Sequence, residues 1–146
     1  MAVAHGMLDH AQRDLLDKVR HGVLTTLKRD GTPQMSIVGF AYDDQDRLIR
    51  ISVTDSRAKT RNLRRDPRAS LLVTPPSMRG YVVLEGTAEL TPVARQPDDA
   101  TVDELVDLYR TIAGEHPDWA EFRQAMVDER RLVLRIAVSH TYGWLA

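Results

Sequence analysis

Short segments of strand-forming residues follow one another through the first part of the chain, and tight polar turns join them. The segments are Val23–Leu27, Gln34–Tyr42 and Leu48–Val53. The first turn contains Asp30-Gly31, a pair that strongly favours a hairpin, and the second is Asp43–Asp46. Successive strands joined by such short turns pair antiparallel. The sequence therefore predicts a three-stranded meander, which limits the fold to architectures built on an antiparallel sheet.

The rest of the chain adds strands and helices to this meander. Further strands are predicted at Ala69–Val73, Tyr81–Leu90 and Leu132–Val138. Gly86 lies inside the second of them and favours a bulge or bend there. Helices are predicted at His10–Arg20, Arg57–Arg65, Thr101–Ile112 and Asp118–Glu129. This many antiparallel strands in 146 residues favour a closed or nearly closed barrel, because closure removes exposed edges. We expect a single domain, residues 1–146, that is mainly β with flanking helices.

Basic residues are concentrated in one segment, 57–68, which has a net charge of +5 from six cations and Asp66, whereas the whole chain has a net charge of −1. The cations are Arg57, Lys59, Arg61, Arg64, Arg65 and Arg68. The segment begins a predicted helix that Ser56 is placed to cap, and a helix N-terminus beside cations is an anion site. Thr54, Thr60 and Asn62 add neutral donors. The pattern favours a phosphate site, with a solvated arginine face as the alternative.

Several classes of chemistry are excluded. The chain has no cysteine, so a disulfide framework, a thiolate nucleophile and a Cys-ligated metal are ruled out. Its five histidines lack metal-ligand spacing, and no nucleophile elbow or phosphate-binding glycine motif is present. No apolar run approaches the roughly 20 residues that span a bilayer, and residues 1–9 lack a secretory pattern. We expect a cytoplasmic protein without membrane or nucleic-acid partners, and a cofactor for any difficult chemical step.

The basic segment and several other motifs resemble a known family. Residues 57–70, RAKTRNLRRDPRAS, resemble the cofactor-phosphate segment of the pyridoxamine-phosphate-oxidase-like split β-barrel proteins. The match is closest to the actinobacterial branch that uses the deazaflavin coenzyme F420. Residues 22–27 with 30–34, the stretch 109–116 and the ending 139–143 are also typical of that branch. The resemblance covers nearly the whole chain.

The resemblance implies a split β-barrel homodimer with two cofactor sites at the subunit interface. The residues expected at the phosphate are Arg57, Lys59, Thr60 and Asn62. Those expected along the ribityl chain and ring are Gln34, Ser36, Ser52, Val53 and Thr54. The partner subunit would supply Arg79, Gly80, Tyr81 and Tyr142. The surplus arginines Arg61, Arg64 and Arg65 are available to the glutamate tail of F420.

The activity implied is that of an F420-dependent reductase, which transfers a hydride from reduced deazaflavin to a conjugated, electron-poor small molecule. FMN is the alternative cofactor, and an F420-binding or carrier protein with little turnover is the alternative function. His140 and Tyr142 are weak candidates for a proton donor, so no catalytic residue is assigned. The chain stops at Ala146, without the longer Arg- and Trp-bearing ending of true pyridoxamine phosphate oxidases, so vitamin B6 oxidation is not expected.

Overall fold

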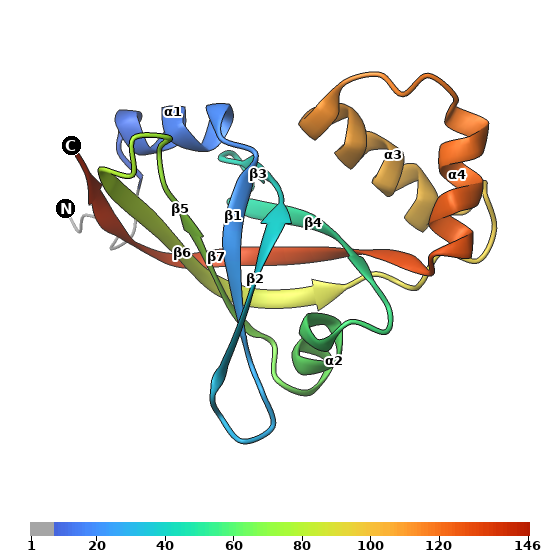
Figure 1. Cartoon of the computed structure of the whole chain (residues 1–146), viewed down its shortest axis with the longest axis horizontal. Coiled ribbons are helices and arrows are strands. Elements are labelled where there is room, and N and C mark those ends of the chain that lie inside the picture. Colours follow the sequence, from blue (N-terminus) through green and yellow to red (C-terminus); the bar gives the residue numbers. More distant parts are fainter. Residues whose placement is uncertain (1–7) are drawn as a thin grey trace.

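The computed structural model describes residues 8–146, which form a curled antiparallel sheet with helices around it (Figure 1). The sheet has seven strands in the order β2-β1-β5-β6-β7-β4-β3. The strands are β1 (His21–Leu27), β2 (Pro33–Gly39), β3 (Ala41–Asp43), β4 (Leu48–Thr54), β5 (Arg68–Val73), β6 (Gly80–Leu90) and β7 (Arg131–Leu145). The helices are α1 (His10–Lys18), α2 (Ala58–Arg65), α3 (Ala100–Ala113) and α4 (Trp119–Asp128). This architecture confirms the predicted mainly-β split barrel with flanking helices.

The two ends of the sheet approach each other because the sheet curls around its core. Strand β2 lies at one end and contacts β4, which lies one strand from the other end. We call this line of approach the seam. Helix α2 contacts β1 and β2 beside it. The side chains of Phe40, Leu71 and Ile136 are fully buried inside the curl. The seam is therefore the place where distant parts of the chain meet over a closed core.

Two predicted strands have different bounds in the structure. The strand predicted at Gln34–Tyr42 is broken at Phe40, whose side chain is fully buried and whose N–H donates to the Arg20 carbonyl at 2.9 Å. The chain changes direction there, so β3 pairs with β4 instead of continuing β2. The last strand does not end at Val138 but continues to Leu145.

A bulge explains why the sequence pattern does not predict the second half of β7. The pairing of β6 with β7 shifts between Glu85 and Gly86, so that Ser139 has no partner in the ladder. This confirms the irregularity expected at Gly86, where a Cβ atom would collide with the Ala137 carbonyl. One extra residue on β7 reverses which positions face the core. The simple alternation of Leu132–Val138 therefore ends at the bulge although the strand does not.

Helices α3 and α4 form a hairpin that covers one end of the sheet (Figure 1). Its core contains Val102, Leu105, Phe122 and Met126, packed with Val133 of β7. Both helices were predicted from this periodicity and agree within two residues at each end. None of the helices within residues 8–146 is long and apolar enough to cross a membrane.

A row of apolar side chains crosses the outer face of the sheet, on the side away from the core. Each of five adjacent strands contributes one residue in direct register. These residues, called the apolar row below, are Ile37, Val23, Leu72, Val83 and Tyr142. Ile37 is 76% exposed, Tyr142 47% and Leu72 36%, and Met35 and Trp144 next to the row are also exposed. Val83, within the row, is itself buried. The exposed apolar side chains around it are typical of an interaction site.

Candidate functional site

A pocket of about 260 Å³ lies at the seam, and we call it the seam pocket. Its walls come from β2, β4, the start of α2 and the start of β7. The lining residues are Ile37, Val38, Gly39, Ser52, Val53, Thr54, Arg57, Lys59 and Arg131. The structure therefore brings together five of the predicted cofactor residues, namely Ser52, Val53, Thr54, Arg57 and Lys59.

The seam pocket is strongly positive. Three of its residues, Arg57, Lys59 and Arg131, are cations, and no carboxylate lines it. Burial, and then the charges of Arg57 and Arg131, lower the pKa of Lys59 below its ordinary value of 10.5. Within residues 8–146 the side chains of Arg57 and Lys59 have no hydrogen-bond or ion-pair partner. A site with partnerless cations and the hydroxyls of Ser52 and Thr54 can bind a phosphate.

The predicted cap of α2 is wrong in detail. Ser56 does not cap the helix; the N-cap position is Arg57, and its side chain makes no capping hydrogen bond. The Arg57 N–H donates to the Thr54 carbonyl at 3.1 Å, so a turn carries the chain from β4 into α2. Because no side-chain oxygen caps α2, the N–H groups of Ala58 and Lys59 can add to an anion site beside the cations, whereas the Thr60 N–H already donates to the Arg57 carbonyl at 3.1 Å.

Asp55 connects the elements that carry the three cations of the seam pocket. Its carboxylate accepts hydrogen bonds from Arg64 of α2 at 2.6 Å and from Arg130, just before β7, at 3.0 Å. Its N–H donates to the Arg130 carbonyl at 3.0 Å. These contacts hold the end of β4, the helix and the start of β7 in fixed positions. The guanidinium groups of Arg130 and Arg64 also lower the pKa of the Asp55 carboxyl.

We expect Asp55 to contribute to acid stability. Its pKa is lower in the folded chain than its ordinary value of 3.8, so its contribution is complete above that value. The contribution is lost as the pH falls through the lowered folded pKa. The Asp55→Asn variant should therefore lose less stability than the wild type when thermal unfolding is followed from about pH 6 into the carboxylate range. The control is Asp46→Asn in the β3–β4 turn, and equal acid sensitivity of wild type and Asp55→Asn would contradict the prediction.

Thr60 and Asn62 lie inside the fold. The Thr60 side chain is fully buried, and its hydroxyl donates to the Thr54 carbonyl at 2.7 Å. The Asn62 amide donates to the Thr26 hydroxyl at 3.1 Å, and that hydroxyl donates to the Gln34 side chain at 3.2 Å. Both residues therefore fix α2 against β4 and the β1–β2 hairpin. Their direct contact with a cofactor stays a prediction.

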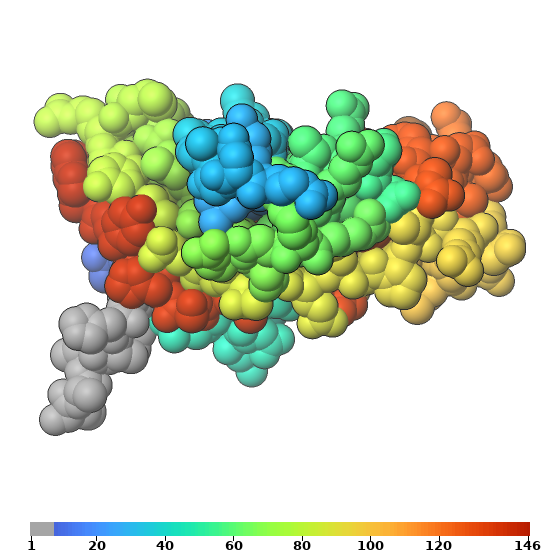
Figure 2. Space-filling view, turned by 90° about the horizontal axis from the view of Figure 1, so that it is seen from below, coloured from blue at the N-terminus to red at the C-terminus, as the bar shows by residue number. Residues whose placement is uncertain are grey.

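A second basic pocket, of about 680 Å³, lies between the β1–β2 hairpin and α2, and we call it the hairpin pocket. Figure 2 shows the two elements meeting on one face of the molecule, with the hairpin in blue and α2 in green. The lining residues are Lys28, Arg29, Gln34, Ala58, Arg61, Asn62, Arg64 and Arg65. The structure thus places Gln34, Arg61 and Asn62 together, but apart from the seam-pocket residues.

The arginines of the hairpin pocket divide into two groups. Arg64 is paired with Asp55, and Arg65 donates to the Leu27 carbonyl at 2.7 Å. Arg61 has no side-chain partner within residues 8–146, and neither do Lys28 and Arg29. Of the three surplus arginines, Arg61 is therefore the one whose side chain has no hydrogen bond or ion pair within the described part of the chain.

Ser36 lies between the two basic pockets on β2. It is paired with Leu24 of β1 and so faces the core side of the sheet. Its hydroxyl is buried and has no hydrogen-bond partner within the described residues. A buried hydroxyl without a partner is unfavourable, so this group is expected to bind a ligand or water. The observation supports the prediction that Ser36 lines a cofactor site.

The residues expected from the partner subunit do not line the seam pocket of their own chain. Gly80 and Tyr81 begin β6, and Arg79 precedes them, beside α1 and the C-terminal residue Ala146. Tyr142 belongs to the apolar row. These four residues can reach a seam pocket only from a second copy of the chain, and this contribution stays a prediction.

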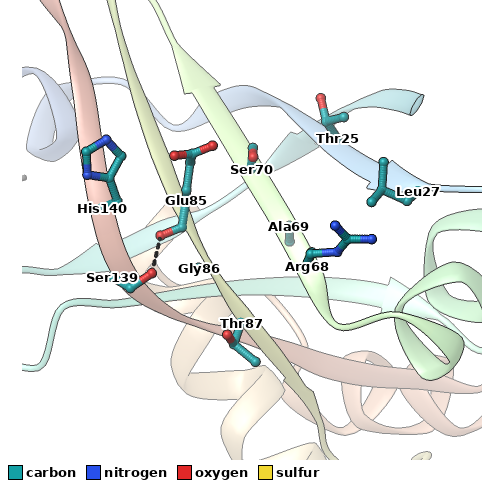
Figure 3. Close-up of a pocket in the computed structure, with 10 residues that line it drawn as sticks. All are labelled: Thr25, Leu27, Arg68, Ala69, Ser70, Glu85, Gly86, Thr87, Ser139 and His140. Carbon is teal, nitrogen blue, oxygen red and sulfur yellow. Dashed lines mark hydrogen bonds between the residues drawn. The ribbon is translucent and has the colours of Figure 1, made fainter. Parts of the chain in front are cut away.

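A third pocket, of about 420 Å³, lies at the bulge on the outer face of the sheet (Figure 3). It brings together Glu85 and His140, which are paired across β6 and β7. The Ser139 hydroxyl donates to the Glu85 carbonyl at 3.4 Å, and Arg68 is paired with Asp66 at 2.7 Å. Sequence reasoning missed this pocket because it ended the last strand before the bulge. Among residues 8–146, no group of three or more His, Asp or Glu side chains is placed to bind a metal.

Comparison with solved structures gives the same fold. The chain is similar to the conserved hypothetical protein Rv2991 of Mycobacterium tuberculosis, with 24% identity and a TM-score of 0.73 over 99% of this chain and 89% of that chain. A structure described as an F420 reductase has 23% identity and a TM-score of 0.69 over 92% of this chain and 98% of that chain. The haem storage protein HutZ from Vibrio cholerae has 12% identity and a TM-score of 0.69 over 94% of both chains.

A family model covers nearly the whole chain. Residues 8–145 match the model described as pyridoxamine 5'-phosphate oxidase, which confirms the family expected from the sequence motifs. The fold similarity to an F420 reductase is consistent with that assignment. The chain therefore belongs to the pyridoxamine 5'-phosphate oxidase family, a family of flavin-type oxidoreductases.

Proposed function

We propose that this protein is an F420-dependent reductase that binds the phosphate of the deazaflavin cofactor in the seam pocket. The observation that carries the proposal is the pair of partnerless cations, Arg57 and Lys59, beside the hydroxyls of Ser52 and Thr54. Cations held close together without a counter-charge repel one another, and this repulsion is relieved when an anion binds. The family membership supports a flavin-type cofactor as the source of that anion.

The hairpin pocket favours F420 over FMN. FMN ends at its phosphate, whereas F420 continues into a chain that carries carboxylates. Arg61, Lys28 and Arg29 line the hairpin pocket and have no side-chain partner within residues 8–146, and both basic pockets include residues from the start of α2. An anionic extension beyond the phosphate would use them, and FMN would not. The fold similarity to an F420 reductase supports the same choice.

The bound cofactor would supply a hydride to a conjugated, electron-poor small molecule, and the protein would bind and orient it. Gln34 and Ser36 lie on the core-facing side of β2 and can donate hydrogen bonds to the ribityl chain and ring. Ile37 extends from the same strand beside the seam pocket and would exclude water from the ring. No residue of the chain is required as a nucleophile.

We propose that the protein forms a homodimer in which a second copy of the chain covers the apolar row. Ile37 belongs both to the row and to the lining of the seam pocket, so the edge of the interface would border the cofactor. A copy bound there would bring a second set of Arg79, Gly80, Tyr81 and Tyr142 near the site. The exposed apolar surface of this face supports the proposal, because a single chain leaves it uncovered.

Titration of the purified protein with F420 and with FMN, followed by ring fluorescence, tests the proposed function. Tight F420 binding, together with oxidation of reduced F420 by an electron-poor acceptor, is the expected result. Tight FMN binding with negligible F420 binding would overturn the choice of cofactor. Binding of F420 without turnover by any acceptor would favour the carrier function, which the similarity in fold to a haem storage protein makes a specific alternative.

A further inference from the structure

We propose that Arg131 is the third phosphate-binding cation of the seam pocket, and that Glu129 binds its guanidinium group until the anion arrives. This inference rests on the proposed function, because the anion is the cofactor phosphate. It adds a residue that lies far along the chain from the basic segment. It also assigns a role to a carboxylate next to the pocket.

The position of Arg131 is fixed by the sheet. It is the first residue of β7 and is paired with Thr54, the last residue of β4. Arg57 follows Thr54 by one turn, and Lys59 lies in the first turn of α2. The three cations therefore come from two elements, the start of α2 and the start of β7, and converge on one pocket. Such convergence is what a phosphate requires, since its oxygens point in several directions.

The contacts of Arg131 leave its guanidinium group available. Its Nη2 and Nε atoms lie 3.1 and 3.2 Å from a single oxygen of Glu129, and Nη1 lies 3.5 Å from the Ser52 hydroxyl. The Glu129 side chain is 48% exposed, so its attraction for Arg131 is screened by solvent. A phosphate offers more oxygens and can accept two parallel hydrogen bonds from the guanidinium group. The anion therefore replaces Glu129 as the partner of Arg131.

Arg130, the residue before Arg131, makes contacts different from those of Arg131. Arg130 is bound through two of its nitrogens to Asp55, and its backbone has a positive φ of 54°. It does not line the seam pocket. Arg50 on β4 is paired with Asp107 of α3, also outside the pocket. Arg130 and Arg50 thus maintain the fold, whereas Arg131 faces the site.

The test is cofactor binding by the variants Arg131→Gln, Arg131→Lys and Glu129→Gln, measured by ring fluorescence and by thermal stabilisation with pyrophosphate. Arg131→Gln should weaken binding about tenfold or more, and Arg131→Lys should weaken it less because the charge is kept. Glu129→Gln should strengthen binding, because it removes the competing carboxylate. Arg50→Gln, with the same loss of charge outside the pocket, should bind as the wild type does.

The outcomes separate this inference from the proposed function. Unchanged affinity in Arg131→Gln, while Lys59→Ala binds weakly, would overturn the role of Arg131 and leave the cofactor site intact. Weaker binding by Glu129→Gln would overturn the competing role of Glu129. If neither F420 nor FMN binds the wild type, the proposed function fails, and pyrophosphate then tests the three-cation site alone.

Discussion

Replacement of Lys59 by alanine is expected to weaken binding of F420 about ten- to one-hundred-fold. A charge-assisted hydrogen bond to a phosphate contributes about 1.5–3 kcal/mol, and each 1.4 kcal/mol is about tenfold in affinity. Lys59 is half-buried in the seam pocket and has no protein partner within residues 8–146, so its charge has no use there except towards a ligand. The measurement is a fluorescence titration of wild type and variant.

The same substitution should leave the free protein folded and at least as stable. Burial and the nearby charges of Arg57 and Arg131 both disfavour the ammonium group, so removal of Lys59 relieves an unfavourable interaction. Lys18→Ala is the matched control, because that lysine is paired with Asp14 on α1, away from the pocket. Equal affinity of Lys59→Ala and wild type would remove the proposed phosphate anchor. A large loss of stability in the variant would show instead that Lys59 supports the fold.

Substitution of Leu72 by glutamate is expected to convert the proposed dimer into a monomer. Leu72 is the central residue of the apolar row, and two-fold symmetry would place the new carboxylate in the interface twice. An uncompensated buried charge costs several kcal/mol, roughly 3–5 in measured cases. Sedimentation or light scattering should show the wild type at twice the mass of one chain and the variant at the mass of one chain.

Cofactor binding by this variant gives an independent measure of how the site is built. If the partner completes each seam pocket, Leu72→Glu should also bind F420 weakly although every phosphate-binding residue is unchanged. Ala120→Glu is the control, since Ala120 is exposed on α4, away from the apolar row and the seam pocket. A Leu72→Glu protein that remains dimeric, or a wild type that is monomeric, would place the interface elsewhere or remove it.

The sequence was sufficient to predict most of the fold. Strand-forming segments and the turn residues between them located the hairpin and the central strands. The helical spacing of apolar residues located α3 and α4. The bulge at Gly86 was also predicted, but its effect on the partner strand was not. The extra residue Ser139 shifts the alternation of β7, so the regular pattern ends at Val138 although the strand continues to Leu145. The outer-face pocket with Glu85 and His140 was missed for that reason.

The candidate site was predicted only in part, because contacts between distant segments decide which of its cations are paired and which are available to a ligand. The residue pattern located the basic segment, and only the family resemblance divided its cations between the phosphate and a glutamate tail. In the structure, Asp55 binds Arg64 and the Leu27 carbonyl binds Arg65, whereas Arg57 and Lys59 have no side-chain partner among residues 8–146. Arg131 and Ser52, which meet at the seam, are 79 positions apart in the sequence. No local pattern contains such a pairing.

The position of the pocket at the seam links the cofactor to the integrity of the whole domain. Its walls include Ile37, Thr54 and Arg131, so any fragment that contains them all must span at least residues 37–131. The pocket exists only after the first hairpin and the last strand have both joined the sheet. A ligand bound there connects the two margins of the curled sheet and stabilises the native state by mass action, by about 2.7 kcal/mol at one hundred times its dissociation constant. A bound cofactor would therefore stabilise the folded domain in addition to taking part in the reaction.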